Sequence, residues 1–109
     1  MSASAAWAML IVAGIVDVVW ATTMKLSHGY TRPLWTIVSL LALATFVFLL
    51  GRALTALPVG SAYAVWTGIG AAGTLLAGAF FFAEALTPLR LSGVGLIVFG
   101  VVLLHSAKA

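Results

Sequence analysis

The segment that decides the fold is Ala5–Met24, AAWAMLIVAGIVDVVWATTM, an apolar run interrupted by one charge, at Asp17. About 20 apolar residues in a helix are needed to cross the hydrocarbon core of a bilayer, and this run has that length. The rest of the chain is similar, because 64% of its 109 residues are hydrophobic and only 6% are charged. Soluble domains have about 25% charged residues. The composition therefore predicts an integral membrane protein.

Three further apolar stretches follow the first, and polar turns with glycine or proline separate them. We expect one domain over residues 1–109, with transmembrane helices at about 5–24, 34–52, 59–83 and 89–106. Strands of a membrane barrel would alternate apolar and polar residues, whereas these runs are continuously apolar. The predicted fold class is an all-α membrane protein with four transmembrane helices.

Basic residues are divided almost evenly between the two sides of this predicted domain. With four spans, Arg52 and Lys108 lie on one side. Lys25, Arg32 and Arg90 lie on the other, and they form no basic patch typical of nucleic-acid binding. So small a difference in Lys and Arg predicts insertion in both orientations. Two oppositely inserted copies would supply the inverted repeats that many transporters use, so we expect an antiparallel dimer.

Asp17 is an acidic residue in the middle of the first span. A carboxylate at the bilayer centre costs about 2.5–3.5 kcal/mol, and such residues usually face a bundle interior or an aqueous cavity and serve transport. A proton or an organic cation could each neutralise this group, but both cannot occupy it fully at once. That competition is a sufficient basis for proton–cation exchange. The alternative is a structural acid, protonated and hydrogen bonded across helices.

Small and aromatic residues accompany this acid at helical spacing. Trp20 follows Asp17 by three positions, and Gly14 precedes it by three, which leaves room beside the acid. Tyr63 and Trp66 are also three apart, on the third span. An aromatic cage around a carboxylate suits a delocalised cation through cation–π attraction. The alternative for these rings is the aromatic belt found at membrane interfaces.

Glycines in the third and fourth spans raise two further expectations. Gly68, Gly70 and Gly73 form a G-x-G-x-x-G pattern, but no strand precedes it, so we reject a dinucleotide site. These glycines indicate close helix contact or a bend that lets the span flex. Gly93 and Gly100 lie on one face of the fourth span, where they join two protomers or pack within one.

The residue patterns of catalytic and metal sites do not occur in the sequence. It has no cysteine, and its two histidines have no neighbouring cluster of metal ligands. A Ser-His-Asp arrangement and a phosphate-binding loop are also missing. We therefore expect neither an enzyme nor a protein with a metal or another cofactor.

Four motifs together carry a family resemblance: AGIVDVVWA at 13–21, KLSHGYTR at 25–32, LPVGSAYAVWTGIG at 57–70 and GVGLIVFGV at 93–101. They resemble the small multidrug resistance family, and within it the guanidinium-exporter subtype. The resemblance covers essentially the whole chain. It implies an antiparallel dimer in the bacterial inner membrane that exchanges protons for cationic substrates by alternating access.

The resemblance also assigns roles by position. Asp17 stands where the family has its essential glutamate, and Gly14 matches the glycine one turn before it. Trp20, Tyr63 and Trp66 match the aromatic residues that line the family's binding site. The remaining matches are the hinge glycines Gly68 and Gly70 and the dimer-motif glycines Gly93 and Gly100.

Two positions depart from the family pattern. Asp17 is one methylene shorter than glutamate, so its carboxylate is withdrawn towards α-carbon 17 by roughly 1.5 Å. This distance equals about the rise of one residue in a helix. Phe46 stands where the guanidinium subtype has a serine that hydrogen bonds within the site. Both changes lie where substrate is handled, which implies a changed substrate choice or one subunit of a heterodimer.

We therefore expect a proton-coupled antiporter that exports guanidinium-type or related small organic cations, with Asp17 as the shared site. Its expected partners are protons, the cation, membrane lipid and a second copy or a related subunit. Three alternatives remain open. They are one subunit of an obligate heterodimeric pair, a broader quaternary-ammonium multidrug exporter, and, from a different class, a non-transporting membrane interaction protein.

Overall fold

The computed structural model describes residues 1–107, which form four α-helices. These are α1 (Ala3–Leu26), α2 (Pro33–Ala53), α3 (Val59–Phe82) and α4 (Pro88–Ala107). All four are long and apolar enough to cross a membrane, and residues 1–107 include no strand. The predicted class, an all-α membrane protein, is confirmed.

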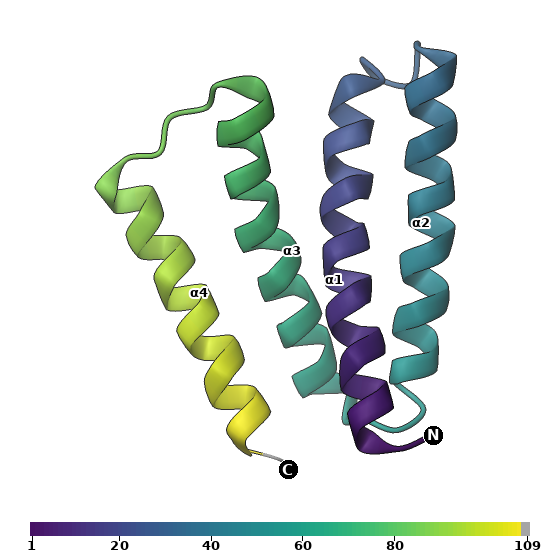
Figure 1. Cartoon of the computed structure of the whole chain (residues 1–109), viewed down its shortest axis with the longest axis vertical. Coiled ribbons are helices and arrows are strands. Elements are labelled where there is room, and N and C mark those ends of the chain that lie inside the picture. The colour runs from purple at the N-terminus through teal and green to yellow at the C-terminus, as the bar shows by residue number, and fades with distance from the viewer. Residues whose placement is uncertain (108–109) are drawn as a thin grey trace.

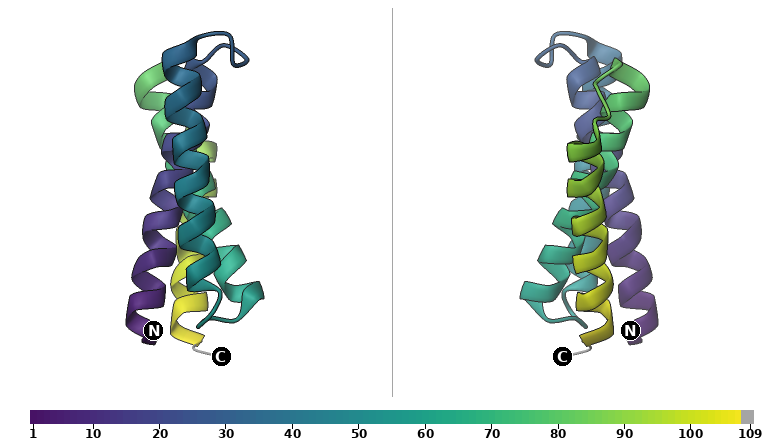
Figure 2. Two further views of the ribbon diagram at one scale, coloured as in Figure 1. Left: turned by 90° about the vertical axis from the view of Figure 1, so that its right-hand side faces the viewer. Right: turned by 90° about the vertical axis from the view of Figure 1, so that its left-hand side faces the viewer.

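The four helices stand side by side in a single layer (Figure 1). Helix α1 packs against α2 on one side and against α3 on the other, and α4 packs on the far side of α3. The protein measures 42 × 34 × 16 Å, and the narrow dimension is evident in the side views of Figure 2. Since a helix with its side chains is about 10–12 Å thick, the layer is one helix deep. A site on such a layer stays open on one side until something packs over it.

Helices α1 and α3 run in the same direction, and α2 and α4 run in the opposite one (Figure 1). Ala3, Ala107 and the connection 54–58 lie at one end, which we call the terminal end. The connections 27–32 and 83–87 lie at the other, which we call the loop end. The parallel pairing of α1 with α3 matters for the site, because equivalent turns of these two helices lie at the same depth.

Capping residues and prolines explain where the helices begin. The Ser2 hydroxyl accepts a hydrogen bond from the Ala5 N–H at 3.1 Å and caps α1. Pro33 and Pro88 are the first residues of α2 and α4, and Pro58 directly precedes α3. Proline suits the first turn because its missing N–H would have no partner in the helix there. The polar turns read from the sequence therefore end one span and start the next.

The hydrophobic core lies near the terminal end, where α1, α2 and α3 meet. Leu10, Ala53, Ala62 and Val65 are buried almost completely. Partly buried side chains surround them: Trp7, Met9, Leu50, Leu54, Leu57, Trp66, Ile69, Val101 and Leu104. Helix α4 contributes only the edge of this cluster and has no buried residue of its own. The first three helices therefore form a packed platform, and α4 is attached to one side of it.

A charged contact joins α1 to the end of α3 at the loop end. Lys25 Nζ lies 3.0 Å from Glu84 Oε2 and 4.8 Å from the centre of the Phe82 ring. The Glu84 carboxyl group rests on Gly78, where a Cβ would overlap with Glu84 Oε1. The Glu84 N–H also donates to the Gly78 carbonyl at 3.3 Å. We call this group of four residues the Lys25–Glu84 clasp.

Candidate functional site

Asp17 projects from α1 onto the backbone of α3. Its Oδ2 lies directly against Gly70, where a Cβ would overlap with that oxygen. The Asp17 side chain is half-buried, and within residues 1–107 it forms no ion pair. A carboxyl group at this depth usually has a partner or faces a cavity. Here the space that a glycine leaves on the neighbouring helix receives it.

Close packing of α1 on α3 continues on both sides of this contact. A Cβ at Gly14 would lie 2.6 Å from Ile69 Cγ2, and one at Gly73 would lie 2.6 Å from Val18 Cγ2. The sequence suggested that Gly14 leaves room beside the acid, but the structure places Gly14 opposite Ile69. The glycine that makes room for the carboxyl group is Gly70. Sequence spacing could not show this, because the two residues lie on different helices.

Four aromatic rings form a continuous row across three helices. The Trp20 ring on α1 lies 5.3 Å from the Phe46 ring on α2, and Phe46 lies 5.4 Å from Trp66 on α3. Trp66 in turn lies 5.5 Å from Tyr63. These separations are typical of aromatic rings in contact. We call Trp20, Phe46, Trp66 and Tyr63 the aromatic row.

The two ends of the aromatic row differ in exposure and in hydrogen bonding. Phe46 is only 4% exposed, whereas Tyr63 is 58% exposed. The indole nitrogens of Trp20 and Trp66 are buried and have no hydrogen-bond partner among the described residues. The Thr45 hydroxyl next to Phe46 is not their acceptor: Thr45 is exposed, and its hydroxyl donates to the Leu41 carbonyl of its own helix at 2.8 Å. Two donors in the row are therefore left for a ligand or another chain.

Hydroxyl groups hold the backbone of α1 at Trp20. Thr23 Oγ1 donates to the Val19 carbonyl at 2.7 Å and lies 3.2 Å from the Trp20 carbonyl. The Ser39 hydroxyl of α2 reaches the same Trp20 carbonyl at 3.4 Å and is fully buried. No motif in the sequence marks Ser39 or Thr23 as site residues. The available signal was a hydroxyl in each of two apolar spans.

The other predicted glycines lie away from the acid. A Cβ at Gly68 would lie 2.9 Å from Val101 Cγ2 and 3.2 Å from Ile97 Cγ2, so Gly68 contacts α4. Gly93 and Gly100 on α4 have nothing within 4 Å of an added Cβ. The sequence left two interpretations of these glycines, packing within the protomer and packing between two protomers. The structure shows no close packing on them within the protomer. No other side chain packs closely on either glycine.

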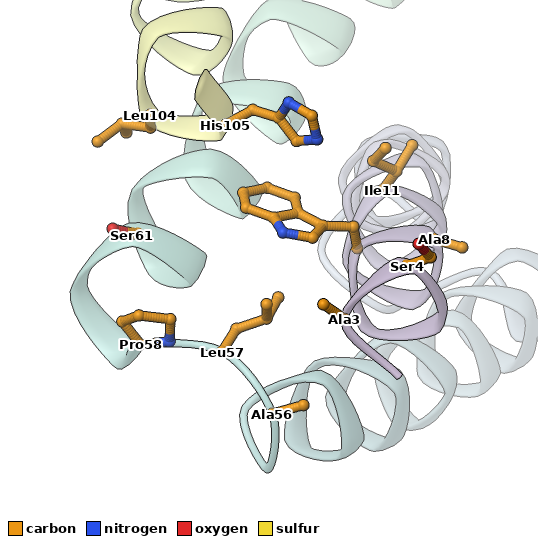
Figure 3. A pocket seen from close by; sticks show the side chains of 11 residues that line it. Ala3, Ser4, Ala8, Ile11, Ala56, Leu57, Pro58, Ser61, Leu104 and His105 are labelled. Carbon is orange, nitrogen blue, oxygen red and sulfur yellow. The ribbon is translucent and has the colours of Figure 1, made fainter. Parts of the chain in front are cut away.

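Asp17 lines neither of two cavities, one at the terminal end and one between α3 and α4. One of about 660 Å³ at the terminal end surrounds Trp7 and His105, whose rings meet edge to face at 4.7 Å (Figure 3). The other, about 390 Å³, is a groove between α3 and α4 that includes Tyr63 and Gly100. The Asp17 carboxyl group therefore lies outside these two cavities, against the backbone of α3 at Gly70. Among residues 1–107, no three His, Asp or Glu side chains gather as metal ligands would.

Four apolar helices with one acidic group at mid-span define a small multi-pass membrane protein of the transporter type. The model of the Small Multidrug Resistance protein family matches residues 5–97. A guanidinium exporter of Yersinia pseudotuberculosis is 45% identical over 103 residues, which cover 94% of this chain and 99% of the relative. Guanidinium exporters of Citrobacter freundii and Escherichia coli are 44% and 42% identical, each over 88% of this chain and 91% of the relative.

The chain belongs to the small multidrug resistance family. Members of this family are four-helix transporters that function as dimers and carry small molecules. The family membership predicted from the sequence motifs is confirmed.

Proposed function

We propose that this protein is a proton-coupled antiporter that exports guanidinium or a related small organic cation across the bacterial inner membrane. The relatives named guanidinium exporters support the substrate, and the four apolar helices support the location. The names of these relatives also identify a transporter rather than an enzyme. The single observation that carries the mechanism is the Asp17 carboxyl group at mid-span, which lies against Gly70 and has no ion-pair partner within residues 1–107.

In this mechanism Asp17 alternates between two ligands. The deprotonated carboxylate binds the cation, and the aromatic residues Trp20, Trp66 and Tyr63 beside it stabilise its delocalised charge. After the site opens to the other side of the membrane, protonation of Asp17 expels the cation. Because each ligand lowers the affinity for the other by the same factor, the two movements are coupled. Gly14 sets the α1–α3 distance one turn from the acid through its contact with Ile69.

Movement between the two open states requires that α3 flex. We assign this hinge to Gly68 and Gly70, because Gly68 contacts α4 and Gly70 contacts the acid. A bend here would move the α4 contact and the Asp17 contact relative to each other. Flexible glycine positions are among the identifiable causes of helix kinks.

The proposed dimer is antiparallel. The almost even distribution of basic residues supports insertion in both orientations. The open glycine face of α4, with Gly93 and Gly100, supplies a surface on which a second α4 can pack closely. Two opposed copies of a one-layer protein would enclose Asp17 between their layers.

A heterodimer is the second candidate, and a specific observation favours it. The indole N–H groups of Trp20 and Trp66 have no acceptor within residues 1–107, because Phe46 lies between them. A related subunit with a serine at position 46 and a glutamate at position 17 would contribute a more polar half of the site. The homodimer and the heterodimer differ in whether this chain is active alone.

Reconstitution in liposomes tests the proposal. The purified chain alone should move protons when a guanidinium gradient is imposed, and Asp17→Asn should abolish that movement. Asp17→Glu is the matched control, because it retains the ionisable group and should retain coupled exchange. Activity only after mixing with a related subunit would establish the heterodimer. Coupled exchange of quaternary ammonium ions but not of guanidinium would establish the broader exporter.

If the folded and inserted protein moves no protons with any cation, alone or mixed with a related subunit, the transport proposal is contradicted. That result would favour the non-transporting membrane interaction protein. Insertion and helix content are measured on the same samples by protease protection and circular dichroism. The Asp17→Asn variant should be indistinguishable from the original chain in both measurements, since Asp17 forms no ion pair in the described part of the chain.

A further inference from the structure

Phe46 occupies the space between the two indole rings of the aromatic row. Its ring centre lies 5.3 Å from that of Trp20 and 5.4 Å from that of Trp66, and its side chain is almost fully buried. These contacts join α2 to α1 on one side and to α3 on the other. A cation therefore cannot insert between the two indoles while Phe46 stays in place.

The same ring determines the polarity of this space. Phenylalanine has no hydrogen-bonding group, and the buried indole N–H groups of Trp20 and Trp66 have no acceptor. The acceptors that a cation's N–H groups can use are the Asp17 carboxyl group on Gly70 and the hydroxyl of the exposed Tyr63. Because Phe46 fills the space between the indoles, a cation bound to Asp17 must lie beside the row rather than within it.

We propose that Phe46 is a size-limiting specificity residue, which restricts this transporter to small flat cations and excludes bulky, fully alkylated ones. This inference rests on the proposed function and specifies its substrate class. A flat cation can lie along the edge of the row with its charge on Asp17. A cation with alkyl groups in all directions needs the volume that Phe46 fills.

Replacing Phe46 by alanine would open an apolar cavity between two indole rings. Apolar cavities of this kind stay dry and accept apolar groups of matching size. The alkyl arms of a bulky cation are such groups, and each methylene accommodated in an apolar pocket changes discrimination by about 10- to 200-fold. Removing the ring should therefore change selectivity in one direction, towards bulky cations.

The experiment compares two probe cations, guanidinium and tetraethylammonium, in liposomes that contain one variant each. For Phe46→Ala, the ratio of the tetraethylammonium rate to the guanidinium rate should rise at least tenfold over the original chain. Phe46→Leu retains most of the side-chain volume and should change the ratio less than threefold. Phe48→Ala is the matched control on the same helix, because Phe48 is 60% exposed and outside the row.

An unchanged ratio in Phe46→Ala that still transports guanidinium would overturn the proposal. If Phe46→Ala does not fold, Phe46→Val replaces it, and an unchanged ratio there has the same consequence. Failure of the proposed function is distinct: the original chain then transports neither probe, alone or mixed with a related subunit. That result would contradict both proposals, whereas guanidinium transport with an unaltered size ratio would contradict only the role of Phe46.

Discussion

The platform of α1, α2 and α3 and the single helix α4 are packed in different ways. The platform has a buried core around Leu10 and Val65, and glycines at its α1–α3 contact draw the two helices together. Helix α4 is as apolar as the others but has no buried residue, and a Cβ added at Gly93, Gly95 or Gly100 would meet nothing within 4 Å. In lipid, small residues matter because they let helices approach closely. The platform therefore builds the site, and α4 is suited to contacts outside the protomer.

The largest expected effect comes from the platform. Gly70→Val would place a side chain where Asp17 Oδ2 now lies, so the carboxyl group must move. Misplacement of a binding group by about 1 Å can cost 100-fold, and we expect a loss of coupled exchange of that order. Proton-coupled guanidinium flux in liposomes measures the loss. Gly51→Val on α2 is the control, since an added Cβ there meets nothing within 4 Å.

A matching change on α4 should act on assembly rather than on the protomer. Gly100→Leu adds bulk to the open face of α4, and we expect at least a tenfold weaker dimer with unchanged helix content. Dimer dissociation in bilayers, followed by fluorescence energy transfer between labelled copies, measures this. If Gly100→Leu dimerises as tightly as the original chain, the dimer interface lies on another surface. Helix α4 would then not be the helix that makes contacts outside the protomer.

The unpaired indole donors give an intermediate effect. Trp20→Phe and Trp66→Phe keep an aromatic ring but remove an N–H group that has no partner within residues 1–107. The thermal stability of the isolated protomer should not fall, because no bond is lost. Cation binding or subunit pairing should weaken about fivefold if a hydrogen bond worth about 1 kcal/mol forms there. A loss of protomer stability with unaltered binding would show that the donors are already satisfied.

The smallest effect belongs to the Lys25–Glu84 clasp. Both partners are substantially exposed, and pairs of this kind contribute about 0–1 kcal/mol. Glu84→Gln should lower the unfolding free energy by no more than that, and the difference should shrink in high salt. The exchanged pair Lys25→Glu with Glu84→Lys should restore most of the loss. If the exchanged pair has the same unfolding free energy as Glu84→Gln, the Lys25–Glu84 ion pair does not stabilise the loop end.

Composition and motif spacing are sufficient to predict the fold class and the family. The reason is that the length of an apolar run and an acid in its middle are local properties of the sequence. Contacts between helices were not accessible in the same way. That Asp17 rests on Gly70, or that Lys25 reaches Glu84, depends on how α1 and α3 are aligned. Phe46 was recognised as a departure from the family, but its position between the two indoles required the structure.

The arrangement of the helices in one layer was likewise not predictable from apolar periodicity. All four spans are apolar around most of their circumference, so no polar face marks the outside of the layer. Which face of α4 stays open is decided by Gly68, which contacts Val101 and Ile97 and thereby orients α4 on α3. The roles of Gly68 and Gly70 as a hinge remain predictions.

Proton release on cation binding tests the central claim most directly. Purified protein in weakly buffered detergent solution is mixed with guanidinium, and a pH-sensitive dye records the protons released. If Asp17 is shared, the release should saturate together with guanidinium binding, vanish in Asp17→Asn and persist in Asp17→Glu. Saturable binding of guanidinium to the active assembly without any proton release would contradict the account.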